Sequence, residues 1–261
     1  MTDELTFARR VAREAGEIVQ GYFGRPLAVE EKGWADPVTA ADRAAEAHIR
    51  AAIDRDWPGD AIYGEEEGAA AGATGRTRLI DPLDGTANFA GGLPTFAVVL
   101  TLLGADGQPL LNVTHDPVRA ETFEAVRGGG ARLNDAPVSV GGDAELALAL
   151  VHLAFPRMRD LWERSLDLTR RVTAATPHAR NVGSSALAQA YVACGRLHAH
   201  ARVSVGEFDI VGGNLMIEEA GGVVTDLGGG PFGDGARGLL AAGPQMHAKL
   251  LRLELIRALP C

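Results

Sequence analysis

The sequence predicts an α+β half followed by an α/β half in one compact unit, and three observations lead to this fold class. Apolar residues recur at helical spacing in two segments near the N-terminus, as in amphipathic helices. Short β-prone runs separated by glycine, proline and aspartate follow these segments. From about residue 144 strand-like and helix-like segments alternate, which is typical of layered α/β folds. We therefore expect halves at residues 1–143 and 144–261.

Composition and charge exclude several classes of protein. The 261 residues are 46% hydrophobic, which is enough for a sizeable core. A net charge of −9 argues against a general polyanion-binding surface, so we expect no nucleic-acid partner. A phosphate substrate stays compatible with this charge, because a bound metal ion reverses the local field. The cysteines Cys194 and Cys261 form no disulfide framework or metal-binding pair.

The N-terminus has no apolar signal core, and no run of 18 apolar residues exists. We therefore expect a soluble, cytoplasmic protein without a membrane span.

Local signals place the elements of the first half. One helix should end near Gly24 and Pro26, and a second should start at Thr39 and end at Pro58 and Gly59. The stretch VEEKGWADP between them is expected to be a polar loop, as is GEEEGAAAGATGRT further on. Four strands are expected, followed by turns and one more short strand in GGGARLNDAPVSV: TRLIDPL, FAVVLTLLG, LLNVTHDP and ETFEAVRG.

The second half should alternate between strands and helices. We expect strands in ALALVHLAF, HARNVG, LHAHARVS, GVVTDL and LLAAG. We expect helices in DLWERSLDLTRRVTAA, SSALAQAYVACG, FDIVGGNLMIEEAG and PQMHAKLLRLELIRAL. This order indicates a layered α/β arrangement.

The stretch LIDPLDGTANF is the strongest chemical signal in the chain. Asp81 and Asp84 follow a buried strand directly and flank Pro82 and Leu83. Two buried carboxylates close together repel each other, and a divalent cation removes that repulsion. Mg²⁺ prefers carboxylate and carbonyl oxygens. Gly85 and the following residue then offer backbone amides, which suit a phosphate group.

Three further acidic positions have both structural and functional interpretations. Thr39 and Asp42 form the T-x-x-D pattern of a capping box at a helix start. Asp209 is a favourable charge near a helix N-terminus. Glu65 opens an acidic loop that solvent alone would explain.

Four motifs together resemble the inositol monophosphatase family: DPVTAAD, GEE, IDPLDGTANF and FD…EEAGG, which occur in the family's order and spacing over nearly the whole chain. That family belongs to a superfamily of Mg²⁺-dependent, Li⁺-sensitive phosphatases that includes fructose-1,6-bisphosphatase. The resemblance implies a layered αβαβα sandwich, a homodimer, and hydrolysis of a small phosphate ester.

The resemblance also implies residue roles. Glu65, Asp81 and the Leu83 carbonyl would hold one Mg²⁺, and Asp81, Asp84 and Asp209 a second. Glu65 would also face a third, weakly held ion through water.

Other residues would handle the phosphate and the attacking water. The resemblance places Asp84 and the amides of Gly85 and Thr86 at the phosphate. It assigns Asp42 and the Thr86 hydroxyl to orienting and deprotonating the attacking water. Lys32 falls near a lysine of the family's motif, although the loop that follows it is one residue shorter.

The second half should recognise the leaving alcohol. Ser184 and Ser185 open a helix in a stretch similar to the family's R-x-x-G-[ST] turn, where Ser184 is either a substrate contact or an N-cap. Arg202 stands where inositol-phosphate enzymes typically have glutamate. Arginine there resembles family members that also cleave fructose 1,6-bisphosphate, because it favours a second anion. The alternative is an ordinary strand arginine. Phe208 replaces the family's usual tryptophan.

Weaker signals receive structural interpretations. GGGPFG matches G-x-G-x-x-G but contains Pro231 and has no helix after it, so it predicts a turn. His198 and His200 would share one face of a strand without a further ligand, so we expect ordinary strand histidines there, and likewise at His115.

Two classes of function remain open. The first is a Mg²⁺-dependent phosphomonoesterase acting on inositol monophosphate or a related sugar or polyol phosphate. The same chemistry on fructose 1,6-bisphosphate, histidinol phosphate or a 3′-phosphoadenosine nucleotide is the alternative. The second class is a non-catalytic interaction protein, since some bacterial family members are implicated in transcription complexes.

Overall fold

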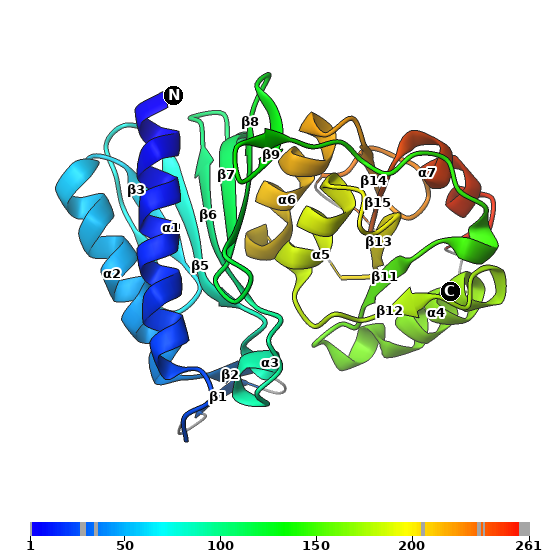
Figure 1. Cartoon of the computed structure of the whole chain (residues 1–261), viewed down its shortest axis with the longest axis horizontal. Helices are drawn as coiled ribbons and strands as arrows, with labels where there is room; N and C mark the ends of the chain where they lie inside the picture. Colours follow the sequence, from blue (N-terminus) through cyan, green and yellow to red (C-terminus); the bar gives the residue numbers. More distant parts are fainter. Residues whose placement is uncertain are drawn as a thin grey trace.

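The computed structural model describes residues 2–26, 30–33, 36–204, 207–233, 236 and 238–255, and the side chains at 2, 31–33, 36–37 and 207–209 lie outside that description. Its elements stack in five layers, helices alternating with two sheets (Figure 1). This is the αβαβα sandwich that the sequence resemblance implied. None of the helices among the described residues combines the length and apolar character needed to cross a membrane.

The first layer consists of the two predicted N-terminal helices, α1 (Thr2–Tyr22) and α2 (Ala40–Asp56). They pack together on one face of the larger sheet, where their apolar stripes join a buried cluster that includes Val11, Ile49 and Ile53. Burying such stripes against a sheet is the main source of stability for helices of this kind.

The second layer is an eight-stranded sheet in the order β10-β9-β8-β7-β6-β5-β3-β4, in which only the β3–β5 pair is parallel. Its strands are β3 (Ala61–Gly64), β4 (Gly68–Ala70), β5 (Thr77–Asp84), β6 (Ala97–Leu103), β7 (Pro109–Asp116), β8 (Glu121–Val126), β9 (Gly130–Leu133) and β10 (Ala136–Pro137). The four long strands match the predicted runs. Sequence reasoning missed β3, and it assigned β4 to a loop.

The middle layer is formed by α5 (Ser185–Ala193) and α6 (Glu207–Glu219). Both helices are buried between the two sheets, which explains why their sequences are apolar on nearly every side. Two adjacent glycines let α6 approach its neighbours closely. A Cβ on Gly212 would lie 2.1 Å from the Asn112 amide oxygen, and one on Gly213 would lie 2.3 Å from that of Gln189.

The fourth layer is a five-stranded sheet in the order β12-β11-β13-β15-β14, with β11 parallel to both of its neighbours. Its strands are β11 (Val151–Ala154), β12 (Ala179–Arg180), β13 (Ala199–Arg202), β14 (Val223–Thr225) and β15 (Leu239–Ala242). All five lie in predicted segments. The strand predicted for ALALVHLAF is shorter than expected, because residues 146–148 form a 3₁₀ turn.

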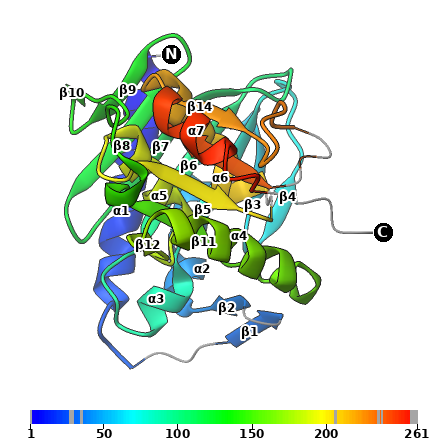
Figure 2. The ribbon, with the colours of Figure 1, turned by 90° about the vertical axis from the view of Figure 1, so that its right-hand side faces the viewer.

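The fifth layer contains α4 (Trp162–Ala175) and α7 (Pro244–Leu251), which cover the outer face of the smaller sheet (Figure 2). The last helix is shorter than predicted. It ends at Leu251, and Glu254 already has a φ of 50°, which a helix does not contain. The rest of the predicted helix, residues 256–259, lies outside the described residues.

Two small elements lie at one end of the larger sheet. The predicted polar loop contains a hairpin, β1 (Glu30–Gly33) paired with β2 (Asp36–Val38), so the expectation of an irregular loop was wrong. The short helix α3 (Thr86–Ala90) follows β5 and contacts β2. This end of the molecule therefore holds segments of two of the sequence motifs, DPVTAAD and IDPLDGTANF.

Candidate active site

A β-bulge brings the two motif aspartates to one face of the larger sheet. Asp81 pairs with Val99 and Asp84 with Ala97, so three steps along β5 match two along β6. Residues directly opposite in a sheet share a face, so the extra residue turns Asp81 and Asp84 to the same side. Pro82 sits inside the bulge, where its missing N–H is tolerated. The aspartates are only 3% and 8% exposed.

Asp84 is held by the start of α5. Its carboxylate accepts hydrogen bonds from the Ser184 hydroxyl and from the Ala186 amide at 2.8 Å, with the Ser185 amide at 3.3 Å. A carboxylate is favoured at a helix N-terminus, because the free N–H groups point towards it. The Ser184 hydroxyl also accepts from the Leu187 amide, so Ser184 is the N-cap of α5.

Asp42 forms the capping box and also reaches the second motif. Its Oδ2 accepts from the Thr39 amide and hydroxyl at 2.8 and 2.6 Å. The single proton of the Thr86 hydroxyl has two acceptors within reach, Asp42 Oδ1 at 3.1 Å and the Leu83 carbonyl at 3.0 Å. Burial raises the pKa of the Asp42 carboxyl, while the hydrogen bonds from Thr39 and Thr86 act in the opposite direction. The structure therefore joins Asp42, Thr86 and Leu83 in one buried network.

Glu65 lies beside the two aspartates at the same edge of the sheet. β3 and β5 run parallel, with Gly64 opposite Ile80, so Glu65 follows in register with Asp81. The Glu65 amide continues the ladder by donating to the Ile80 carbonyl at 3.1 Å. Arg157, which comes from the segment after β11, approaches the Glu65 carboxylate at 3.7 Å.

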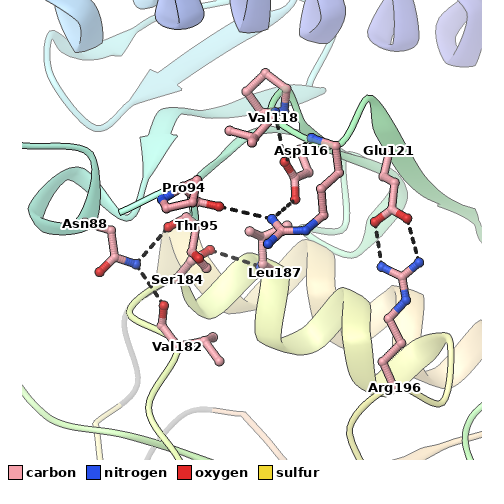
Figure 3. Close-up of polar contacts among 12 residues, drawn as sticks. Asn88, Pro94, Thr95, Asp116, Val118, Glu121, Val182, Ser184, Leu187 and Arg196 are labelled. Atoms are coloured by element: carbon pink, nitrogen blue, oxygen red, sulfur yellow. Dashed lines mark hydrogen bonds and ion pairs between the residues drawn. The ribbon is translucent and has the colours of Figure 1, made fainter. Parts of the chain in front are cut away.

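The turn after Asp84 connects the two sheets. Gly85 has a φ of 99°, and a Cβ there would lie 2.9 Å from the Thr95 carbonyl oxygen, so only glycine fits. The Asn88 amide donates to the carbonyls of Thr95 and Val182, both at 2.8 Å (Figure 3). Because Val182 lies two residues before Ser184, the N-cap of α5, Asn88 links the motif turn to the opposite half of the site.

Arg202 extends the same chain of contacts. It is 8% exposed, and its guanidinium donates to the Ser185 hydroxyl at 3.1 Å and to the Ser204 hydroxyl at 3.0 Å. Asp84, Ser184, Ser185 and Arg202 therefore lie around the first turn of α5. The alternative interpretation of Arg202 as an ordinary exposed strand arginine was wrong, because the side chain is buried.

A buried histidine pair next to Arg202 was missed by sequence reasoning. His152 on β11 is directly opposite His200 on β13, their rings stack at 4.7 Å, and their Nδ1 atoms lie 2.7 Å apart. Burial lowers the pKa of His152 to about 3 and that of His200 well below its usual range, and Arg202 adds to both shifts. Only the strand pairing could have revealed this contact, because the residues are 48 positions apart.

The donors at the sheet edge match a hard cation in type. Two buried carboxylates on one face, with a third alongside, form an arrangement that a divalent cation stabilises. Among the described side chains no three His, Cys, Asp or Glu residues converge closely enough to bind one ion. Asp209 lies on α6, and its side chain, like that of Lys32 on β1, falls outside the described residues. The start of α6 is tied to α5, because the Gln189 amide donates to the Ile210 carbonyl at 3.2 Å.

Comparisons with known proteins match nearly the whole chain to one family. The model of the "Inositol monophosphatase family" matches residues 1–257. A Nus factor SuhB from Pasteurella multocida is 36% identical, with 96% of this chain and 95% of that protein covered. An inositol-1-monophosphatase from Mesorhizobium japonicum is 38% identical, with 85% and 84% covered. The crystal structure of the extragenic suppressor protein SuhB from Bartonella henselae superposes with a TM-score of 0.92 at 31% identity, covering 98% of this chain and all of that one.

The family model spans nearly the whole chain, and the superposed structure reproduces its five layers. Residues of three of the four sequence motifs lie at one edge of the larger sheet, near the starts of α2 and α5. On these grounds the chain belongs to the inositol monophosphatase family.

Proposed function

We propose that this chain is a Mg²⁺-dependent phosphomonoesterase that hydrolyses inositol monophosphate or a related small sugar or polyol phosphate. The observation that carries the proposal is the bulge in β5, which turns the buried Asp81 and Asp84 to one face beside the Asp42–Thr86 network. Membership of the inositol monophosphatase family supports the same chemistry.

In this proposal Glu65, Asp81 and the Leu83 carbonyl hold one Mg²⁺, and Asp81, Asp84 and Asp209 hold a second. Bound Mg²⁺ would polarise the phosphate ester and acidify the attacking water. The carboxylates thereby lose their mutual repulsion, which explains why the chain keeps them buried together.

The Asp42–Thr86 pair takes the proton of the attacking water. A Leu83 carbonyl that holds Mg²⁺ would leave the Thr86 proton to Asp42, so the lone pairs of the Thr86 hydroxyl could accept a hydrogen bond from a water molecule. A carboxyl whose pKa is raised by burial accepts a proton more readily near neutral pH. The amides of Gly85 and Thr86 and the carboxylate of Asp84 would orient the phosphate, with Gly85 allowing close approach of the backbone.

The leaving alcohol meets the start of α5 and Arg202. The Ser185 hydroxyl and the Arg202 guanidinium form the polar part of this surface, since Ser184 is engaged as an N-cap. A guanidinium here favours a substrate with a second anionic group. We therefore retain fructose 1,6-bisphosphate, histidinol phosphate and 3′-phosphoadenosine nucleotides as alternative substrates.

A phosphate-release screen tests the proposal. Purified protein is incubated with inositol monophosphate, fructose 1,6-bisphosphate, histidinol phosphate and a 3′-phosphoadenosine nucleotide, each with Mg²⁺, with EDTA, and with Mg²⁺ plus Li⁺. We expect Mg²⁺-dependent release that Li⁺ inhibits. No release from any ester in the presence of Mg²⁺ would contradict the proposal. Activity on the bisphosphate that is lost in Arg202→Glu would assign the second anion to Arg202.

A second candidate function is participation in a transcription complex, which relatives named Nus factor SuhB favour. The net charge of −9 points to a protein partner and not to nucleic acid. Tight, Mg²⁺-independent binding to a protein of the transcription machinery, without any turnover, would favour this role. A homodimer is also proposed, from the family alone, and sedimentation would test it.

A further inference from the structure

The turn that contains Glu65 is held in place by the buried carboxylate of Glu46 on α2. Glu46 lies on α2 and is completely buried. Its two oxygens accept hydrogen bonds from the backbone amides of Glu66 and Glu67, at 2.9 and 3.1 Å. These are the two residues that directly follow the proposed metal ligand Glu65. Glu46 therefore fixes the backbone of a turn that carries three consecutive acidic side chains.

Arg50 balances the charge of Glu46. One helical turn further along α2, its guanidinium lies 2.8 Å from the Glu46 carboxylate and also donates to the Gly68 carbonyl, where β4 begins. A buried carboxylate is tolerated when it is paired and its lone pairs are used, and both conditions hold for Glu46.

The chain leaves room for this contact at Gly64. A Cβ on Gly64 would lie 2.0 Å from the Glu46 Oε1 atom, so any other residue there would displace the carboxylate. Asp42, Glu46 and Arg50 are spaced four residues apart, which puts them on one face of α2. One rigid helix face therefore contacts Thr86 through Asp42 and the Glu65 turn through Glu46.

We propose that Glu46 is a positioning residue for the metal site, which acts by holding the Glu65 turn against the end of β5. This inference rests on the proposed function, because it concerns the Mg²⁺ that Glu65 would hold. It assigns to Glu46 no contact with metal or substrate. Partners that orient a metal ligand typically contribute 10–100-fold to metal affinity.

Glu46→Gln tests the inference. The amide keeps the size of the side chain but replaces one acceptor oxygen with an NH₂ group, which cannot accept from the Glu66 or Glu67 amide. Glu124→Gln is the matched control. Glu124 is also buried and paired with an arginine, Arg9, but it lies on β8, three strands away from β5.

Three measurements are compared in the wild type and both variants: Mg²⁺ binding by calorimetry, amide hydrogen exchange of the peptide spanning residues 61–70, and the Mg²⁺ dependence of phosphate release. For Glu46→Gln we expect Mg²⁺ to bind about 10-fold or more weakly and the turn amides to exchange faster. At saturating Mg²⁺ kcat should stay within a few-fold of the wild-type value. Glu124→Gln should leave the Mg²⁺ affinity and the exchange of this peptide unchanged.

The outcomes separate this inference from the proposed function. If Glu46→Gln binds Mg²⁺ as tightly as Glu124→Gln and the wild type, and the amides of residues 61–70 exchange at the same rate in all three, Glu46 has only a structural role. The inference is then overturned. If Glu46→Gln weakens Mg²⁺ binding but the wild-type protein releases no phosphate, the proposed function alone is overturned. A wild-type protein that binds no Mg²⁺ overturns both. Should Glu46→Gln fail to fold, Arg50→Gln takes its place, with a smaller expected loss of Mg²⁺ affinity, and an unchanged affinity there would overturn the inference.

Discussion

The acidic edge of the larger sheet and the inner face of the smaller sheet are both buried polar clusters, but their charges are opposite. The edge contains Asp42, Asp81 and Asp84, whereas the inner face contains Arg202 and the His152–His200 pair. α5 lies between them, and its first turn contacts Asp84 on one side and Arg202 on the other. We take this polarity to separate the proposed phosphate chemistry from recognition of the leaving group.

Burial acts on the two clusters in opposite ways. It raises the pKa of Asp42 and lowers those of His152 and His200, because in each case it disfavours the charged form. The acidic edge can recover its charge when a cation binds. The histidine pair can stay neutral by sharing one proton between its facing Nδ1 atoms. We therefore expect a bound cation to stabilise the acidic edge, and a change of pH to alter the stability of the histidine cluster.

Asp81→Asn should give the largest effect, because it removes the negative charge shared by both proposed Mg²⁺ positions and replaces one of the two carboxylate oxygens with an NH₂ group that cannot bind a cation. We expect Mg²⁺-dependent phosphate release to fall by more than ~100-fold, beyond the range typical of outer partners of a metal site. The unfolding midpoint without Mg²⁺ should not decrease, since one of two buried like charges is gone. Asp54→Asn on the exposed side of α2 is the control and should change neither quantity. An active, Mg²⁺-dependent Asp81→Asn protein would contradict the site assignment.

Thr86→Val should give the next largest effect. Valine keeps the shape of threonine but removes the hydroxyl that links Asp42 to the proposed attacking water. We expect kcat to fall on the order of 100-fold, as is typical when acid–base assistance is lost. Thr86→Ser retains the hydroxyl and should keep most of the activity. Equal kcat values for the valine and serine variants would remove the hydroxyl from the mechanism.

The acidic edge could be recognised in the sequence because its residues lie in short local motifs. Asp81, Asp84 and Gly85 fall within five consecutive residues at a strand end, and Thr39 with Asp42 forms a capping pattern. The αβαβα arrangement followed from the resemblance of those motifs to a known family. Their roles in binding metal and phosphate stay predictions.

The inner cluster could not be predicted, because strand pairing creates it. His152 and His200 meet only because β11 and β13 are parallel neighbours in register. Glu46 was likewise missed, because an acidic side chain on a helix is usually exposed to solvent, whereas this one is buried. The strands β1, β2 and β3 are each four residues long or shorter, so their sequences show no periodic pattern. The last helix was predicted too long because its apolar pattern continues beyond Leu251.

The histidine pair should make the protein sensitive to acid. In the unfolded chain each histidine has a pKa near 6.5, whereas the folded state holds His152 at about 3 and His200 well below its usual range. The unfolded chain therefore binds more protons below pH 6.5, so stability is full above that pH and falls as the pH drops. At about 1.4 kcal/mol per pKa unit, the pair should remove roughly 2–3 kcal/mol between pH 7.5 and 5.5.

Urea unfolding of the double variant His152→Phe/His200→Phe at both pH values checks this expectation. Phenylalanine retains the stacked rings, and replacing both hydrogen-bond partners leaves no unpaired buried group. The double variant should be close to the wild type at pH 7.5 and lose less stability at pH 5.5. A loss of stability in the double variant equal to that of the wild type would show that other groups cause the acid sensitivity.

Ser184→Ala should give the smallest effect. It tests whether Ser184 caps α5 or contacts the substrate. Its hydroxyl caps α5 through the Leu187 amide and donates to Asp84, so the variant should lose about 1 kcal/mol of unfolding free energy. The Asp84 carboxylate keeps its bond from the Ala186 amide, so KM should change little.

Ser185→Ala is the matched variant, because its hydroxyl contacts Arg202 and caps nothing in α5. It should leave the unfolding free energy nearly unchanged and raise KM for the preferred phosphate ester. If Ser184→Ala raised KM without loss of stability, Ser184 would belong to substrate recognition, and the separation of the two clusters at α5 would fail.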